Sequence, residues 1–173
     1  MKYLPTVCFI NPNSTVSMTD TCRHTLDRID LGSYPIFEFV TNDQGPAAIQ
    51  GARDGEFATE AMLELAEELP DHYGTFVVGC FDDTGVEQLL DKVRRPVIGI
   101  GQAAYHWASL LSQRFVVLTT LDVSVPVIRE SIQRQGPALG CQALQNAKSR
   151  RFGGHVHLCG LPLGRPLSGL SRS

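Results

Sequence analysis

The sequence lacks long apolar runs and the motifs of phosphate-binding loops. Its longest apolar stretches, such as 76–78 and 115–118, are far shorter than the ~20 residues that a membrane-spanning helix needs. It has neither a Gly-rich loop followed by Lys nor a Gly-x-Gly-x-x-Gly segment after a strand-like run. We therefore predict no membrane span and no cofactor.

Cysteine is infrequent and irregularly spaced. The chain has five cysteines, and an odd number at uneven spacing favours reduced thiols over a disulfide framework. The N-terminal residues pass directly into a strand-like segment, without the apolar region and small-residue cleavage site of a secretory signal. We therefore predict a cytoplasmic protein.

Acidic residues are absent after residue 130. Residues 1–130 hold all 18 acidic residues and nine Lys or Arg, whereas residues 131–173 hold six Lys or Arg. A basic tail is able to bind nucleic acid or an acidic partner, because Lys and Arg neutralise phosphates. We favour the simpler interpretation that the tail differs from the body in origin or order, and we predict no nucleic-acid partner.

The body of the chain has the pattern of an α/β protein. With 173 residues, 43% of them hydrophobic, it is able to bury a core as one domain or two small lobes. Short β-branched or aromatic runs alternate with longer segments of mixed polarity, which is typical of βαβ units and a mostly parallel sheet. We expect strands at 7–10, 34–40, 75–78, 97–100 and 115–118. We expect helices from the 11–15 turn to about 29, over 56–69, from the 81–85 turn to about 93, over 102–112 and over 124–135.

Three details of this pattern are also predictions. The Asn-Pro-Asn-Ser-Thr segment at 11–15 supplies turn residues and a cap for the helix that follows. The helix at 56–69 places apolar residues on one face, namely Phe57, Ala61, Met62, Leu65 and Leu69. The Gly- and Pro-rich segment 41–52 is expected to be a long loop, and beyond residue 136 only 142–147 looks helical and 156–158 strand-like.

Cys80 is the most informative single residue. It is expected at the carboxyl end of a buried strand, just before a helix, where N–H groups and the helix dipole favour a thiolate. Such a thiol is a candidate base or nucleophile, whereas the alternative is an inert buried cysteine. The adjacent Asp82 and Asp83 have two possible roles, orienting a proton-transfer group or capping the next helix. For Asp83 we favour capping of the next helix.

Amide and hydroxyl side chains follow two other predicted strands. Asn11, Asn13 and Ser14 come after the first strand, and Thr119 and Thr120 after the fifth. Such neutral groups are able to hold a carboxylate or a ring carbonyl, because they do not compete for its proton. Taken alone they are also an ordinary turn and helix cap.

Histidines offer weaker candidates. His106 is expected in the middle of a helix, as a packed or solvated side chain or as a general acid or base. His155, His157 and Cys159 alternate, so on a strand they would share one face, and His and Cys bind zinc. A fourth ligand is missing, so we predict no metal site.

Five motifs in this order resemble the aspartate/glutamate/hydantoin racemase superfamily, and most closely its hydantoin and allantoin racemase branch. The motifs are Phe-Ile-Asn-Pro-Asn-Ser-Thr at 9–15 with Met-Thr at 18–19, Gly-Pro-Ala-Ala-Ile at 45–49, Gly-Cys-Phe-Asp-Asp-Thr-Gly at 79–85, Pro-Val-Ile-Gly-Ile-Gly at 96–101 with Ala-Ala at 103–104, and Thr-Thr-Leu at 119–121 with Ser-Val-Pro at 124–126. Each motif alone is modest, but the ordered set is specific. The resemblance covers residues 7 to about 141.

The resemblance implies two pseudo-symmetric Rossmann-like lobes with parallel sheets and a site between them. It implies inversion of a carbon next to a carbonyl without a cofactor, by two cysteines on opposite faces of the substrate. The first of these matches Cys80. Asn11, Asn13 and Ser14 match the binding loop of the first lobe, Gly45 and Pro46 a loop that closes over substrate, and Thr119 and Thr120 the loop of the second lobe.

The same resemblance bears on the substrate and the assembly. The expected substrate is a small molecule, a 5-substituted hydantoin, allantoin or an amino-acid derivative. Phe81, with Tyr105 and Trp107, indicates an apolar pocket for its side chain, although these residues are equally suited to a core. Members of the family usually assemble, so a homo-oligomer is expected.

The chain departs from the family after the fifth strand. The late segment with the second catalytic cysteine has no convincing match, because Cys159 is too early and Cys141 matches a position that is not catalytic. We therefore expect a first lobe over 1–95, an incomplete second lobe over 96–147 and a divergent basic tail over 148–173. This pattern suggests a truncated or frame-shifted form that leaves the family near residue 145.

Two alternatives to a racemase remain open from the sequence. The same loops would serve a non-catalytic protein that binds small molecules. Cys80 would also serve as the nucleophile of a hydrolase, with His106 as its base.

Overall fold

The computed structural model describes residues 6–32, 35–112, 114–135 and 141–146. A four-stranded sheet holds β1 (Thr6–Asn11), β2 (Ile36–Thr41), β3 (Tyr73–Val78) and β4 (Val97–Gly99). The strand order is β2-β1-β3-β4, and every pairing is parallel. The predicted α/β class with a parallel sheet is therefore confirmed, as are strands at four of the expected places.

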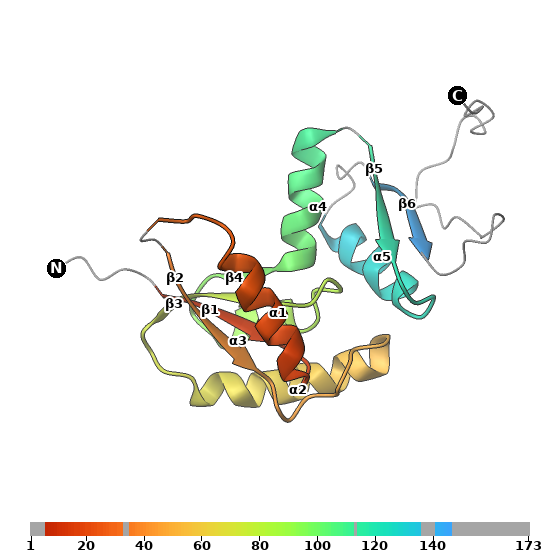
Figure 1. Ribbon diagram of the computed structural model, residues 1–173. Helices are drawn as coiled ribbons and strands as arrows, with labels where there is room; N and C mark the ends of the chain where they lie inside the picture. Colours follow the sequence, from red (N-terminus) through yellow and green to blue (C-terminus); the bar gives the residue numbers. More distant parts are fainter. Residues whose placement is uncertain (1–5, 33–34, 113, 136–140, 147–173) are drawn as a thin grey trace, which may run out of the picture.

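Helices cover both faces of this sheet, as Figure 1 shows. On one face, inward side chains of the strands pack against α2 (Ala52–Glu68) and α3 (Val86–Lys92). This core contains Ile10, Phe76 and Val78 from the strands with Met62 and Leu89 from the helices. Because strand side chains alternate between faces, Phe76 and Val78 join it while Val77 between them does not.

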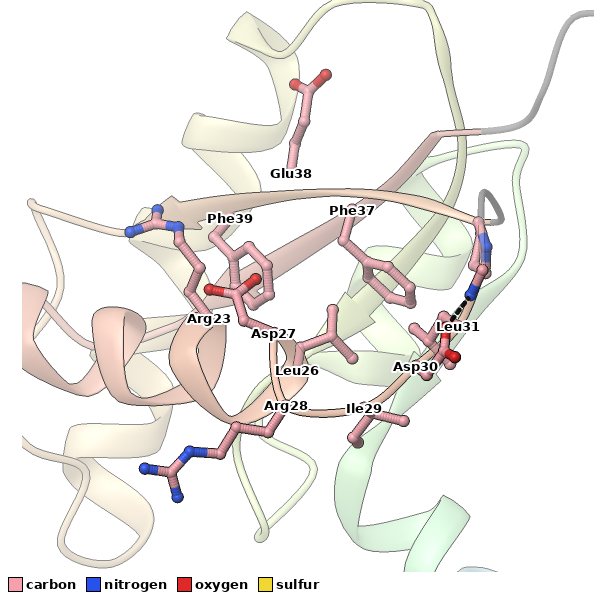
Figure 2. A pocket seen from close by; sticks show the side chains of 12 residues that line it. Arg23, Leu26, Asp27, Arg28, Ile29, Asp30, Leu31, Phe37, Glu38 and Phe39 are labelled. Carbon is pink, nitrogen blue, oxygen red and sulfur yellow. Dashed lines mark hydrogen bonds between the residues drawn. The ribbon is translucent and has the colours of Figure 1, made fainter.

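The opposite face of the sheet packs against α1 (Val16–Leu26). Figure 2 shows Phe37 and Phe39 of β2 pointing toward Leu26, while Glu38 between them points away. On its own side, the Glu38 carboxylate accepts a 2.7 Å hydrogen bond from the Tyr73 hydroxyl. Side chains of the Phe-Glu-Phe segment therefore alternate between the two faces of the sheet, as strand geometry requires.

A second, two-stranded parallel sheet pairs β5 (Phe115–Thr119) with β6 (Cys141–Asn146). It lies with α4 (Ile100–Leu111) and α5 (Ser124–Arg134), to the upper right in Figure 1. A small core joins Tyr105 of α4, Val117 of β5 and Ile128 and Ile132 of α5. In the part of the chain that the structure describes, no helix is long and apolar enough to cross a membrane.

The structure corrects several details of the predicted elements. The segment at 142–147, predicted to be helical, lies in strand β6 instead. Its Ala, Leu and Gln residues favour a helix locally, but parallel pairing with β5 satisfies the backbone and overrides this weak preference. Helix α1 ends at Leu26 rather than near residue 29, and α2 begins four residues earlier than predicted, at Ala52.

Two further differences concern packing. Phe57, predicted on the buried face of its helix, is 52% exposed, because the core-facing side of α2 is formed by Ala58, Ala61 and Met62. The strand expected at 97–100 pairs with β3, so the first sheet extends past the lobe boundary predicted after residue 95. The lobe boundaries themselves stay a prediction, and the predicted tail at 148–173 and strand at 156–158 lie outside the described residues.

Candidate functional site

The candidate site lies at the carboxyl edge of the four-stranded sheet. Strands β1, β2 and β3 end at Asn11, Thr41 and Val78, and the loops that follow start side by side because the strands are parallel. Backbone hydrogen bonds continue beyond the strands: the Gly79 N–H donates to the Ile10 carbonyl (2.8 Å), and the Asn42 N–H donates to the Asn11 carbonyl (2.9 Å). The Cys80 turn and the 11–15 loop are therefore neighbours.

Cys80 lies two residues after β3, mostly enclosed but with some solvent exposure. Its Sγ is 3.4 Å from the Thr84 Oγ1. Burial raises the pKa of the thiol above its ordinary value, and the Asp82 carboxylate raises it further, while the Thr84 hydroxyl and the N–H groups of Asp82 and Thr84 lower it. We expected this position to favour a thiolate, but burial outweighs the favourable hydrogen bonds.

The predicted amide residues form a connected network at the end of β1. The Asn11 Nδ2 donates to the Asn13 Oδ1 (3.1 Å) and to the Thr19 Oγ1 (3.0 Å). The Asn13 Oδ1 also accepts from the Thr15 N–H (2.9 Å). Because Asn11 is almost completely buried and its donor is engaged, this side chain shapes the loop.

The cap predicted for the first helix is not made by the N-cap side chain. Thr15 occupies the N-cap position but makes no side-chain capping bond, because its hydroxyl donates to the Ala47 carbonyl instead. The Ser14 N–H likewise donates to the Pro46 carbonyl (2.9 Å). The predicted closing loop is thus already bonded to the 11–15 loop at residues 46 and 47.

Gly45 and Asn42 explain how this closing loop fits. A Cβ on Gly45 would lie 2.6 Å from the Pro12 carbonyl oxygen and 2.8 Å from the Asn42 Nδ2, so only glycine fits there. The Asn42 Nδ2 donates to the carbonyls of Pro12 (3.0 Å) and Ala58 (3.3 Å). Sequence reasoning missed Asn42, since one asparagine in a predicted loop carries no signal of such long-range contacts.

The two aspartates after Cys80 have separate roles. We predicted that Asp83 caps α3, but it does not. Its carboxylate is engaged elsewhere, because its Oδ2 accepts a 2.9 Å hydrogen bond from the Ser131 hydroxyl on α5. Asp82 is nearly buried, and burial followed by repulsion from Asp83 raises its pKa to about 6. Sequence reasoning missed Ser131, which is 48 residues away.

The aromatic residues divide between core and surface. The Tyr105 hydroxyl donates to the Phe81 carbonyl (3.0 Å), and its ring meets the Phe81 ring edge-on at 5.3 Å. Tyr105 is a core residue, Phe81 is 38% exposed beside Cys80, and Trp107 is exposed. His106 is exposed on α4 and bonds the Gln135 side chain (3.2 Å), and it forms no hydrogen bond with Cys80.

Thr119 and Thr120 lie at the carboxyl end of β5, as predicted. Thr119 is half-buried and Thr120 is exposed. The turn after them reaches the start of α2: a Cβ on Gly51, the N-cap residue of that helix, would lie 3.5 Å from Val123. In Figure 1 the β5 arrow likewise points down toward the start of α2. No hydrogen bond among the described residues joins these threonines to the Cys80 turn, so their part in the site stays a prediction.

Two of the pockets near the sheet bear on the site, and neither is centred on Cys80. One, of about 490 Å³, lies between α2, the 82–85 turn and α5, and its lining includes Thr59, Asp82, Thr84 and Arg134. The other, of about 670 Å³, lies between the end of α1 and the start of β2 (Figure 2), at the amino edge of the sheet. The second pocket is therefore on the side away from the candidate site.

Metal-ligating side chains do not gather in the described part of the chain, where no group of three His, Cys, Asp or Glu is placed to hold an ion. The alternating residues His155, His157 and Cys159 lie outside the described residues. Nothing in the described site assigns a ligand set to a metal.

These features define an α/β protein whose candidate site, a half-buried cysteine in a hydrogen-bonded turn, lies at the carboxyl edge of a parallel sheet. The chain belongs to the Asp/Glu/hydantoin racemase family, whose model matches residues 7–150. The resemblance seen in the sequence motifs is thereby confirmed.

Named relatives agree with this assignment. A hydantoin racemase of Rhizobium meliloti is 34% identical over 137 residues, which cover 79% of this chain and 56% of that protein. The fold is similar to that of an allantoin racemase from Klebsiella pneumoniae, with a TM-score of 0.69, 29% identity and coverage of 82% of this chain and 58% of that one. An allantoin racemase from Pseudomonas fluorescens shares the fold with a TM-score of 0.73 at 24% identity. This chain thus spans somewhat more than half the length of these relatives.

Proposed function

We propose that this chain carries the first half of a racemase site, in which the Cys80 thiolate removes a proton from a carbon next to a carbonyl without a cofactor. The observation that carries the proposal is the placement of the sulfur at the carboxyl edge of the sheet, with some solvent access and within reach of the Thr84 hydroxyl and two backbone N–H groups. These donors stabilise the thiolate that a proton abstraction needs.

The substrate class follows from the names of the relatives. Hydantoins and allantoin are cyclic, with an acidic C–H next to a ring carbonyl, so we propose a 5-substituted hydantoin or allantoin. The electron pair of the C–H bond moves to the carbonyl oxygen, and the resulting thiol later returns a proton. The proposed substrate-binding residues are Asn13, Ser14, Gly45, Pro46, Phe81, Thr119 and Thr120, with Asn11 acting by shaping its loop.

If Cys80 is the one thiol that acts on the substrate, the two stereochemical readouts of the reaction should differ in rate. The family resemblance implies a second cysteine on the opposite face of the substrate, and the 173 residues contain no convincing match for it. When one thiol both removes and returns the proton, hydrogen exchanges with solvent mainly on one face. We therefore expect proton exchange to be faster than loss of optical rotation.

The test is incubation with one enantiomer of a 5-substituted hydantoin, and separately of allantoin, in heavy water. Deuterium at the reacting carbon is measured by NMR and the configuration by polarimetry, against a protein-free control. We expect exchange above background, reduced about 100-fold or to background by Cys80→Ser, the scale of a lost acid–base group. Cys22→Ser, which changes a thiol on α1, is the matched control and should leave exchange unchanged.

Other outcomes would separate the alternatives. Exchange that persists in Cys80→Ser would refute the assignment of Cys80. Opening of the ring would indicate a hydrolase, and binding without exchange would indicate a non-catalytic binding protein.

We also propose that the protein acts in the cytoplasm as a homo-oligomer. Cys8, Cys22 and Cys80 are free thiols in the structure, which suits a reducing compartment. Exposed apolar side chains on α4 and β5 support association between copies.

A further inference from the structure

The turn that carries Cys80 contains a residue that the proposed reaction does not use. Asp83 is 8% exposed, and its backbone has a φ of 54°, which is unusual for a residue other than glycine. Burying a carboxylate and straining its backbone both cost free energy. The surrounding structure must therefore hold Asp83 in place.

Two elements from the other side of the site bind this carboxylate. Its Oδ2 accepts the 2.9 Å hydrogen bond from Ser131 of α5. The N–H groups of Gly101 and Gln102, in the first turn of α4, and the charge of Arg134 on α5 also favour its ionised form. Oδ1 makes no hydrogen bond of standard geometry among the described residues, so the N–H contacts are looser than the bond to Ser131.

The Gly-Ile-Gly segment that begins α4 is shaped around Asp83. A Cβ on Gly99 would lie 2.1 Å from the Asp83 Oδ1, and one on Gly101 would lie 2.8 Å from both carboxylate oxygens. A Cβ on Gly101 would also lie 2.3 Å from the Phe81 carbonyl oxygen, the atom that accepts from Tyr105 of α4. Both glycines therefore make room for the Cys80 turn, which accounts for a motif that the reaction leaves unexplained.

The position of Asp83 affects the sulfur through the backbone of the turn. Asp83 lies between Asp82 and Thr84, whose N–H groups lower the pKa of the Cys80 thiol. The Asp83 N–H itself donates to the Cys80 carbonyl (3.1 Å). The charge that raises the pKa of the thiol is that of Asp82, so Asp83 acts through geometry.

We propose that Asp83 is a positioning residue for Cys80: by binding the start of α4 and Ser131 of α5, it holds the turn so that the N–H groups of Asp82 and Thr84 face the sulfur. The inference rests on the proposed function only in treating Cys80 as the reactive group. The test needs no substrate, so its result is informative even if the protein has no racemase activity.

The test is the pH dependence of Cys80 alkylation by iodoacetamide, measured by peptide mass spectrometry so that the other cysteines are distinguished. Asp83→Asn and Asp82→Asn each remove one negative charge beside the turn. Electrostatics alone predicts that both variants lower the pKa of the thiol. Positioning predicts opposite results: alkylation near neutral pH becomes about fivefold slower in Asp83→Asn, because the N–H groups turn away, and faster in Asp82→Asn.

Ser131→Ala gives an independent arm, because it removes the hydrogen bond to Asp83 without changing a charge near the sulfur. It should slow Cys80 alkylation in the same direction as Asp83→Asn, whereas Ser109→Ala on α4, which removes only a bond to the His106 carbonyl, should not. Unchanged or faster alkylation in a folded Asp83→Asn protein overturns the proposal. If circular dichroism shows that Asp83→Asn does not fold, Ser131→Ala decides, and an unchanged rate in that variant overturns the proposal.

Discussion

Asp82 and Asp83 are adjacent and both almost buried, but their carboxyl groups have different surroundings. Burial raises the pKa of Asp83, and the hydrogen bond from Ser131 and the N–H groups at the start of α4 oppose this only in part. Asp82 has burial and the neighbouring charge of Asp83 acting in the same direction, which raises its pKa to about 6. Both carboxyl groups therefore have raised pKa values, but only that of Asp83 is opposed by hydrogen bonds from Ser131 and the start of α4.

We predict that Asp82→Asn stabilises the protein near pH 7. The folded state holds the Asp82 proton more tightly than the unfolded chain, since its pKa of about 6 exceeds the ordinary 3.8. The stabilising effect of protonation is complete below about pH 4 and is lost as the pH rises through 6. Removing the charge should therefore increase the free energy of unfolding by about 2 kcal/mol near neutral pH, and much less at low pH.

Urea denaturation at both ends of this pH range measures the difference. Asp43→Asn, at an exposed aspartate, is the matched control and should have little effect. A gain in Asp82→Asn that is the same at low and neutral pH would show that the titration of Asp82 is not its cause.

At the scale of elements, α4 illustrates how one segment depends on another. Its first turn contains no acidic residue and its N-cap residue makes no side-chain capping bond. The negative charge near its N-terminus comes instead from Asp83, which is in the turn after β3. Close approach of this turn and the helix requires glycine at residues 99 and 101.

We predict that Gly101→Ala destabilises the protein by about 2 kcal/mol or more, because the new methyl group meets the backbone carbonyl of Phe81. Gly55→Ala is the matched control in α2. There the methyl group would meet Thr84 only at ordinary contact distance (3.8 Å), and alanine favours the helix. We expect Gly55→Ala to stabilise by about 0.5 kcal/mol in thermal or urea unfolding, and equal effects of the two substitutions would contradict this packing.

At the scale of the whole molecule, much of the apolar surface is exposed. Trp107, Leu110 and Leu111 share one face of α4, and each is more than half exposed. On β5, Val116 and Leu118 alternate on one face and are also exposed. Contiguous apolar surface of this kind favours association.

We predict that the chain self-associates through α4 at micromolar concentration. Trp107 is the one tryptophan of the chain, so its fluorescence should shift to shorter wavelength as the concentration rises. Analytical ultracentrifugation should show a monomer after the paired change Leu110→Gln and Leu111→Gln. The paired change Leu90→Gln and Val16→Gln, at exposed apolar residues on α3 and α1, should leave association unchanged. A monomer in the unaltered chain would refute the prediction.

Local patterns in the sequence predict part of this protein well. Strand alternation and helix periodicity identify most of the elements, and the ordered motifs identify the family and place Cys80 after β3. Such features depend on residues close together in the chain, so they are visible without the fold. Where a tertiary contact overrides the local preference, the prediction fails, as for β6 and for the exposed Phe57.

By itself, then, the sequence determined the α/β class and the family, and it predicted the residues of a site at the carboxyl edge. Only the tertiary structure decided what surrounds them: the hydrogen bond from Ser131 to Asp83, the hydrogen bond from Asn42 to the Pro12 carbonyl, and the raised pKa of the Cys80 thiol. The reason is physical. A pKa and a buried hydrogen bond depend on solvent exclusion and on atoms brought together from distant segments, and no local pattern records either.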